Sequence, residues 1–204
     1  MASILQTPNI EKAKTVLHFM HLAEKLKCVL RHGWTSTGRQ ESVAEHSWRI
    51  SLLVMACSSS LDSKINLEKT LKMALIHDIA EAITGDIPYF LAPEGSKKRA
   101  EKVQNEKIAI NAIKEMFRDV LGPDWLNLWL EYEECKSYEA KVVKALDKIE
   151  AQIQQNEADP STWLECEEVD ATNGYIKRFS NFDAFLSLLS NEVINESKEV
   201  SENL

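Results

Sequence analysis

The sequence has 204 residues and a mass of 23.2 kDa, and 44% of its residues are apolar and 27% charged. This composition is that of a globular protein long enough to bury its own core, which excludes a largely disordered or fibrous chain. The net charge of −8 and the lack of a long Lys/Arg run argue against nucleic-acid binding. No apolar run approaches the roughly 20 residues of a membrane-spanning helix.

Amphipathic helices are predicted along most of the chain, because Gly and Pro are scarce, at 6 and 5 residues. Apolar residues recur every three or four positions over about 13–30, which predicts a first helix. A break follows at 32–38. The next stripe, over 43–61, has the same period and places His46 in line with the core face.

A third helix is predicted from Asn66, a favourable N-cap residue, toward the dipeptide His77-Asp78. Gly85 and Pro88 are expected to end it. Its apolar stripe consists of Leu67, Leu71, Ala74 and Leu75.

In the second half of the chain, the spacing of apolar residues predicts further helices after a loop that runs from Pro88 to Ser96. They cover about 97–120, 123–134 and 137–156, and a closing helix spans about 182–194, after a looser segment that contains Pro160 and Gly174. We therefore expect an all-α fold with one domain over residues 1–204, a core over about 9–190 and a frayed polar tail over about 195–204.

Four potential metal ligands are spread along these helices: His46, His77, Asp78 and Asp147. Two imidazoles and two carboxylates suit a divalent transition metal and leave positions open for water and a phosphate oxygen. A buried carboxylate costs several kcal/mol unless it is paired or metal-bound, so acids beside an apolar stripe need a partner. The competing interpretation is structural, since a histidine on an apolar stripe is more often a hydrogen-bonded core residue than a ligand.

The sequence around these residues is a more specific signal than the four residue types alone. It reads ESVAEHSW over 41–48, HDIAE over 77–81, TGD over 84–86 and KALDK over 144–148. In this joint pattern, from about Leu26 to Gln155, the chain resembles the HD-domain 5′-deoxynucleotidases.

The resemblance implies an HD-domain helical bundle that hydrolyses deoxynucleoside 5′-monophosphates with one divalent ion. That ion is expected to be Mn²⁺ or Co²⁺, ahead of Mg²⁺, Fe²⁺, Ni²⁺ or Zn²⁺. The implied ligands are His46, His77, Asp78 and Asp147. Arg31 and Trp34 match the pair that shapes the sugar-phosphate pocket, although that pair is adjacent in the bacterial members. Glu81 and Asp86 match the acidic residues of the family.

Chemical reasoning supports two of these roles independently of the resemblance. Residues 77 and 81 are one helical turn apart, so Glu81 projects on the face of a ligand and can transfer a proton during phosphomonoester hydrolysis. Arg31 offers a planar fork of donors that matches a phosphate. Each residue also has a competing interpretation. Glu81 could lie on a solvated helix face and Arg31 at the surface. Trp34 could only fill space in the core, and Asp86 could be an ordinary turn residue.

The histidines also limit the number of metal ions. All five (18, 21, 32, 46 and 77) lie at or before the HD pair, so none falls between Asp78 and Asp147. The sequence pattern of two-metal HD enzymes has additional histidines in that interval. This chain does not match that pattern, so it is expected to bind one ion. His18 and His21 are three residues apart, and we assign them a structural role.

Other functions remain open at this stage. A guanosine tetraphosphate pyrophosphohydrolase uses a similar one-metal set, but an Asp tends to follow the Glu there, where this chain has Ala82. A triphosphohydrolase that acts on dNTPs is another candidate, but that activity is usually associated with longer chains. A non-catalytic helical adaptor would use the metal only as a closed structural site and would not need Glu81.

Three further expectations concern the surroundings of the site. The loop at 88–96, with Lys97-Lys98-Arg99 after it, is a candidate lid that brings cations toward an anionic substrate. The resemblance implies a homodimer, with interface material in the apolar residues Trp125, Leu128, Trp129 and Leu130, although burial within the subunit explains them equally well. The four cysteines are widely spaced and no secretory segment precedes them, which indicates reduced thiols in a cytoplasmic protein.

Overall fold

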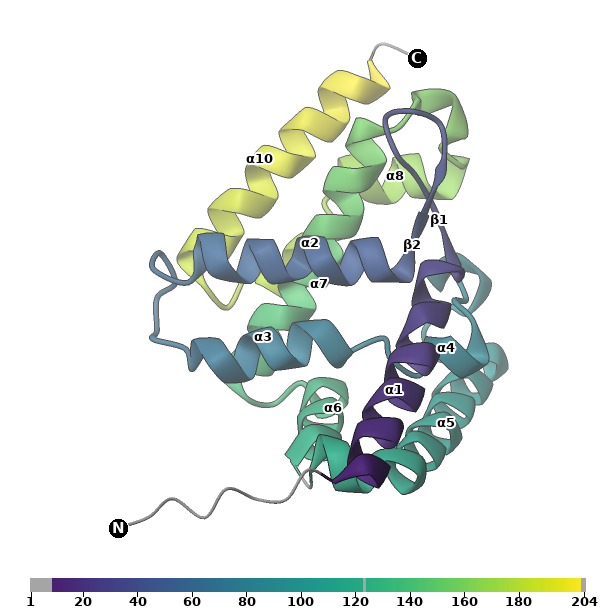
Figure 1. Ribbon diagram of the computed structural model, residues 1–204. Helices are drawn as coiled ribbons and strands as arrows, with labels where there is room; N and C mark the ends of the chain where they lie inside the picture. The colour runs from purple at the N-terminus through teal and green to yellow at the C-terminus, as the bar shows by residue number, and fades with distance from the viewer. Residues whose placement is uncertain (1–8, 123, 203–204) are drawn as a thin grey trace.

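The computed structural model describes residues 9–122 and 124–202 (Figure 1). The all-α class is confirmed, since within these ranges the strands form only a two-stranded sheet. In chain order the elements are α1 (Ile10–Glu24), η1 (Lys25–Lys27), β1 (Leu30–Trp34), β2 (Gln40–Ser42), α2 (Val43–Cys57), α3 (Leu67–Ile76), α4 (Glu81–Thr84), η2 (Tyr89–Leu91), α5 (Lys97–Leu121), α6 (Asp124–Glu134), α7 (Tyr138–Glu157), η3 (Pro160–Thr162), α8 (Glu165–Asn173), α9 (Lys177–Ser180) and α10 (Ala184–Ser201). No helix in the described part of the chain is long and apolar enough to cross a membrane.

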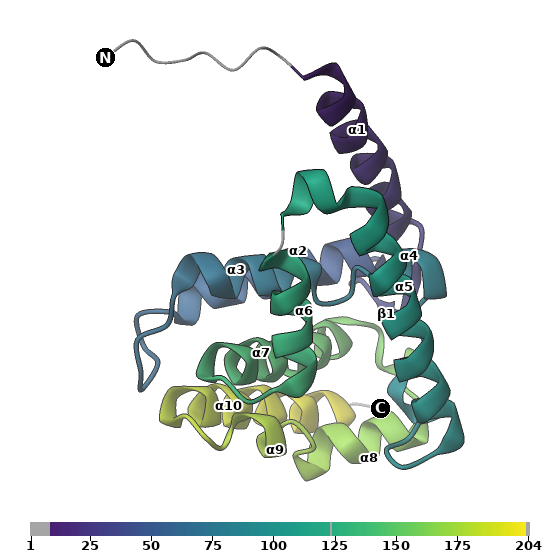
Figure 2. The same cartoon turned by 90° about the horizontal axis from the view of Figure 1, so that it is seen from below.

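Helix α7 lies at the centre of the molecule, between a layer formed by α2 and α3 and a layer formed by α10 (Figure 2). It is buried on nearly every side, with Val142, Leu146 and Ile149 fully covered. A helix that is enclosed in this way normally carries apolar residues all round. The acidic residues Asp147 and Glu150 are therefore exceptional positions of α7, and each of them needs a partner in the interior.

The apolar core has two parts on either side of the site. One joins α2, α3, α7 and α10 around Ile50, Met73 and Leu146. The other joins α1, α5 and α6 with the segment after α3, and includes Ile110 and Trp129. The polar residues of α7 and of the segment after α3 lie between these two clusters, so packing on both sides fixes their positions.

The predicted break at 32–38 is a β-hairpin. β1 and β2 pair antiparallel, with Leu30 opposite Ser42 and Trp34 opposite Gln40, and Gly38 takes a positive φ of 81° in the turn. The first helix consequently ends at Glu24, before the predicted end near residue 30. Its predicted stripe was wrong as a core face over α1, where only Leu22 is buried and Leu17 and Met20 are exposed, but Leu26, in η1, is buried as the stripe predicted.

Helix α3 begins at Asn66 as predicted, and the Asn66 side chain accepts a hydrogen bond from the Lys69 amide. The predicted stripe is only partly correct: Ala74 is buried and Leu71 packs against the core, whereas Leu67 and Leu75 are exposed. The buried positions of α3 are Thr70, Met73 and Ala74. The chain leaves the helix after Ile76, so His77 and Asp78 occupy a turn between α3 and α4 and do not lie on the helix itself.

The C-terminal part is more ordered than the sequence predicts. The segment with Pro160 and Gly174 contains α8 and α9, and α10 continues to Ser201, beyond residue 195 where fraying was expected. Ser197 explains the extension, because it is buried and its hydroxyl donates to Asn156 Oδ1 on α7 at 2.8 Å. Residues 1–8, 123 and 203–204, which the predicted domain and helices include, lie outside the described residues.

Candidate metal centre and active site

His46 lies in the first turn of α2, and the local sequence fixes that turn. Ser42 caps the helix in a capping box, in which its hydroxyl accepts from the Glu45 amide and the Glu45 carboxylate accepts from the Ser42 amide. Arg39, at the end of the hairpin turn, makes a two-point ion pair with the same carboxylate, at 2.8 and 3.0 Å. The hairpin and α2 are thus joined next to His46, which is fully buried.

His77 is oriented by two contacts with the backbone. Its Nδ1 lies 2.8 Å from the Ala74 carbonyl oxygen and donates to it, which leaves the lone pair on Nε2. The indole Nε1 of Trp129, on α6, donates to the His77 carbonyl at 3.0 Å. Nε2 is buried and makes no hydrogen bond within residues 9–122 and 124–202, although it lies 3.0 Å from Asp78 Oδ2. Two lone pairs at this distance repel each other unless a proton or a cation lies between them, and a metal ion would satisfy that condition.

Asp147 comes from the middle of α7 and is held by two side chains. Tyr132, on α6, donates its hydroxyl to Asp147 Oδ2 at 3.0 Å, and Lys148 Nζ lies 3.1 Å from the same oxygen. The other oxygen, Oδ1, lies 3.2 Å from His46 Nε2. Burial acts to raise the pKa of Asp147, but Lys148 and His46 outweigh it and hold the pKa well below its ordinary value. The group is therefore an anion.

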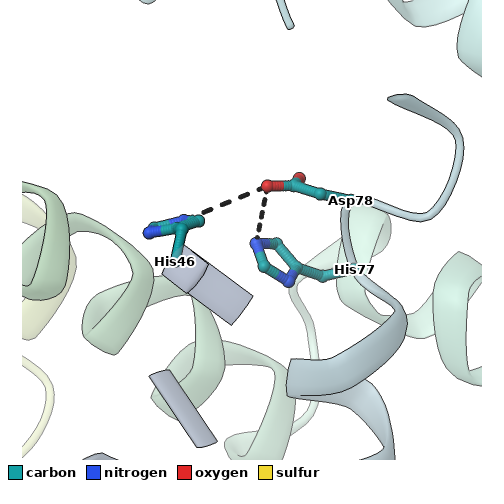
Figure 3. Close-up of side chains that lie close together, drawn as sticks. All are labelled: His46, His77 and Asp78. Carbon is teal, nitrogen blue, oxygen red and sulfur yellow. Dashed lines mark ion pairs between the residues drawn. The ribbon is translucent and has the colours of Figure 1, made fainter. Parts of the chain in front are cut away.

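The structure brings the four predicted ligands together from three separate parts of the chain. His77 Nε2 lies 3.0 Å and His46 Nε2 3.9 Å from Asp78 Oδ2 (Figure 3). Asp147 completes the group, since its Oδ1 lies 3.2 Å from His46 Nε2. Burial and Arg31 act to lower the pKa of His46, but the carboxylates of Asp147 and Glu150 raise it to about 9. A proton on His46 therefore balances these carboxylates, and a divalent cation can replace it.

A second set of charged residues supports the first and was missed in the sequence. Glu150 contacts His46 Nδ1, and Arg49 Nε lies 3.3 Å from its other oxygen. Glu41, on β2, is 2% exposed and lies 3.2 Å from Arg31 Nε. Since an arginine neutralises each of these acids, we interpret Glu41, His46 and Glu150 as a shell that orients the imidazole and not as a second metal site. The spacing of Glu150, three residues after Asp147 on the same helix, was the available signal.

Arg31 is held beside the candidate ligands by acidic side chains. Glu41 holds its Nε, while its Nη1 lies 3.8 Å from Asp78 Oδ2, next to the candidate ligands. The guanidinium is therefore oriented before any substrate arrives. Arg31 and Trp34 both line the cavity described below.

Glu81 lies on the short helix α4 and is 3% exposed. Its Oε1 is 3.1 Å from Lys102 Nζ on α5, and Lys102 also contacts Glu106. Its other oxygen, Oε2, is buried and has no partner in the described part of the chain. Burial and the nearby Asp78 raise the pKa of Glu81 to about 9 despite Lys102, so the carboxyl group holds a proton at neutral pH. Burial also raises the pKa of Asp86, against the opposing effect of Arg31.

A cavity of about 200 Å³ opens beside these residues. His77, Asp78, Asp147, Glu81 and Asp86 line it at one end. Cations face the same space, which offsets the acidic net charge of the chain for an anionic substrate. They are Arg31, Arg99, Lys102, Lys144 and Lys148.

The loop predicted as a lid borders this cavity only in part. Tyr89 and Phe90, in η2, line it together with Arg99. The Tyr89 hydroxyl donates to Asp170 Oδ2 at 2.8 Å, which fastens the loop to α8. Lys97 and Lys98 are exposed and are not among the lining residues, so Arg99 is the basic residue of the run that faces the cavity.

Burial bears on two other sequence expectations. His18 and His21 are exposed on α1, so a structural role for them would lie outside the core. Trp125 and Trp129 are buried within the subunit, at 6% and 1% exposure, and Leu128 packs against the core, so these three cannot form an interface surface. Leu130 keeps 39% exposure.

Comparison with known proteins agrees with this geometry. The family model described as HD domain matches residues 23–185. The 5′-deoxynucleotidase HDDC2 of Danio rerio is 41% identical over 144 residues, which are 70% of this chain and 68% of the relative. The human 5′-deoxynucleotidase HDDC2 is 36% identical over 147 residues, which are 71% and 69% of the two chains. A crystal structure described as a predicted metal-dependent phosphohydrolase, from Magnetospirillum magnetotacticum MS-1, shares the fold with a TM-score of 0.75 and 21% identity, over 93% of this chain and 94% of that one.

Proposed function

The chain belongs to the HD-domain family, and from this premise we propose that it is a metal-dependent 5′-deoxynucleotidase, which releases inorganic phosphate from deoxynucleoside 5′-monophosphates. The observation that carries the proposal is the convergence of two histidines and two aspartates at the end of a cavity lined with cations. The relatives that bear this name span vertebrates, yeasts and Dictyostelium discoideum.

The metal would be held by His46, His77, Asp78 and Asp147. The free lone pair on His77 Nε2 and the two ionised carboxylates fit a divalent cation with mixed nitrogen and oxygen ligands. We propose one ion, Mn²⁺ or Co²⁺ first. When bound, it supplies a Lewis acid that offsets phosphate charge and acidifies a water molecule.

The protein residues have separate tasks in this reaction. Arg31, held by Glu41, would bind the phosphate oxygens and orient the phosphorus atom. Asp86 and Trp34 would contact the sugar side of the substrate, since both line the cavity beside Arg31. Lys148 and Lys102 add positive charge near the transferred group.

Glu81 would act as the general acid. Its raised pKa keeps a proton on the carboxyl group at neutral pH, and its unpartnered Oε2 is free to donate that proton. The 5′-oxygen of the leaving deoxynucleoside needs a proton as its bond to phosphorus breaks. Lys102 holds the other oxygen of Glu81 and so fixes which oxygen faces the substrate.

The test is an assay of the purified protein, loaded with Mn²⁺ or Co²⁺, on dAMP, dGMP, dTMP and dCMP. Orthophosphate release that a chelator abolishes is the expected result. Release of pyrophosphate from guanosine tetraphosphate, with no orthophosphate from the four nucleotides, would replace this function with the pyrophosphohydrolase. No release from any of them, in the metal-loaded protein, would leave a non-catalytic helical protein.

We also propose that the chain forms a single domain and works as a homodimer in the cytoplasm. Free thiols at all four cysteines fit a reducing compartment. Exposed apolar side chains on α1 and α2 offer contact area for a second copy, in place of the buried tryptophans; they are Val16, Leu17, Met20, Trp48, Leu52 and Met55. Sedimentation at twice the mass of 23.2 kDa would support the dimer, and a monomer would refute it.

A further inference from the structure

The cavity extends well beyond the candidate metal ligands, along one face of α7. Asp147, Lys148, Ala151, Gln152 and Gln155 all line it, at the spacing of a single helix face. Asp147 and Gln155 are eight residues apart, which is about 12 Å along the helix axis. A phosphate bound at the Asp147 end therefore leaves the Gln155 end for another part of the same molecule.

The Gln155 end of the cavity has aromatic walls, which suit the binding of a planar ring. His32 packs edge to face against Trp34 and against Phe90, with ring centroids 4.8 and 4.9 Å apart. Trp163 also lines the cavity and donates its Nε1 to the Gln155 carbonyl at 3.0 Å. Aromatic walls with a polar group between them suit a nucleobase, which stacks through its faces and is recognised at its edge.

Polar side chains line this end as well, among them Glu167, which lies 3.3 Å from His32 Nε2, and the Gln155 amide. The orientation of the Gln155 amide is fixed by its neighbours. The Asn156 amide Nδ2 donates to the Val193 carbonyl at 3.0 Å, so Asn156 Oδ1 is the acceptor for Gln152 Nε2, also at 3.0 Å. Gln152 Nε2 donates in addition to Gln155 Oε1 at 3.2 Å. Gln155 Nε2 is then left as a donor, and it is buried without an acceptor within residues 9–122 and 124–202.

We infer that Gln155 recognises the base of the nucleotide, by donating from Nε2 to guanine O6 or thymine O4, and that the enzyme therefore favours guanine and thymine over adenine and cytosine. This inference rests on the proposed function. Guanine O6 and thymine O4 accept a hydrogen bond, whereas adenine and cytosine carry an amino donor at the corresponding position. A buried donor that faces another donor leaves both groups unpaired, which is the arrangement that binding sites reject most strongly.

The experiment compares kcat/KM for dGMP against dAMP and for dTMP against dCMP, in the metal-loaded wild type and in two variants. The wild type should prefer the oxo base by about tenfold in each pair. Gln155→Leu should remove the preference, because leucine offers no donor. Gln155→Glu should reverse it, because a carboxylate only accepts, while it still accepts from Gln152.

Two controls separate base recognition from a structural effect. Deoxyribose 5-phosphate has no base, so its hydrolysis should be the same in the wild type and both variants. Gln104→Leu makes the same chemical change at an exposed position of α5 that does not line the cavity, and it should keep the wild-type preference.

The possible results decide between the inference and its premise. Turnover of all four nucleotides with no preference in the wild type, or an unchanged preference in Gln155→Leu, would overturn the inference alone. An equal loss on nucleotides and on deoxyribose 5-phosphate would also overturn it, because Gln155 would then only support α7. No turnover of any nucleotide by the wild type would overturn the proposed function first.

Discussion

Glu81 illustrates how burial changes the pKa, and so the chemical behaviour, of an ordinary residue type. A glutamate at the surface is ionised at neutral pH, but Glu81 is covered by the cavity wall and faces Asp78. Its raised pKa, of about 9, matches a proton donor and not a base. The proposed role as general acid thus rests on the surroundings of the residue, which no spacing in the sequence reveals.

Replacing Glu81 by glutamine tests this role. Glu81→Gln keeps the shape but has no acidic proton, so kcat for a deoxynucleotide should fall by about 10² to 10⁴. The wild-type rate should also decline as the pH rises past about 9, where the donor loses its proton, and that alkaline decline should be absent from the variant's residual activity.

The matched control is Glu115→Gln, on the exposed face of α5, which should leave kcat and its pH profile unchanged. Metal binding, measured by calorimetry, should be the same in all three proteins. A Glu81→Gln variant with wild-type kcat would remove Glu81 from the mechanism.

At the scale of the elements, Asp183 joins parts of the chain that are distant in sequence. Its Oδ1 caps α10 by accepting from the Leu186 amide at 2.9 Å. Its Oδ2 accepts from the Asp62 amide, in the loop after α2, at 2.8 Å and from the Tyr138 hydroxyl on α7. Burial acts to raise the pKa of Asp183, but these hydrogen bonds outweigh it and lower the pKa.

This lowered pKa gives stability a defined pH dependence. A carboxylate whose pKa is lower in the folded state stabilises the fold above its unfolded value, about 3.9, and loses that contribution as the pH falls below it. Asp183→Asn keeps the cap acceptor but turns an amide donor toward two other donors. We therefore expect it to lower the free energy of unfolding by about 1–3 kcal/mol at pH 7.

Urea denaturation across pH is the measurement. The difference between wild type and Asp183→Asn should shrink as the pH falls from about 5 to about 3. Asp159→Asn is the control, since Asp159 accepts from a single amide, that of Ser161, in the exposed turn η3. This hydrogen bond also lowers the pKa of Asp159, but because the group is exposed the substitution should change stability and its pH dependence less than Asp183→Asn does. A constant difference across this range would show that the charge of Asp183 does not matter.

For the whole molecule, the sequence predicted what depends on periodicity and missed what depends on tertiary contact. The helices around His46 and Asp147 follow from apolar spacing, and the structure places them close to the predicted ranges. The β-hairpin was missed because the pairing of Trp34 with Gln40 depends on a turn at Gly38 that leaves no repeating pattern. The buried face of α3 was assigned only in part, because the six apolar residues of this helix do not single out one face in the sequence.

The candidate site shows the same division. The four proposed ligands were nominated by their residue types and by the family resemblance, and the structure brings them together. Glu150, Lys102 and Gln155 were not nominated, because each acts through a neighbour on another element or on the next turn, and their residue types are common on solvated helix faces. Sequence spacing does not indicate which of many such side chains faces a cavity.

The arrangement of the ligands makes the metal a link across the whole fold. His46 comes from α2, His77 and Asp78 from the turn after α3, and Asp147 from α7, so a bound ion would connect segments about a hundred residues apart. An ion that binds only the folded chain stabilises it by about 2.7 kcal/mol at a hundred times its dissociation constant. For a protein of this size that corresponds to a rise in Tm of roughly 5–10 °C.

We therefore expect Mn²⁺ or Co²⁺ to raise Tm, a chelator to reverse the rise, and Asp147→Asn to abolish it. Asp119→Asn, at an exposed position of α5, is the matched control and should retain the full shift. The shift should also grow with pH, because the ion must displace the proton that the raised pKa of His46 retains up to about pH 9. If the metal raised Tm equally in Asp147→Asn, the ion would be bound elsewhere, and the convergence of these four side chains would need another explanation.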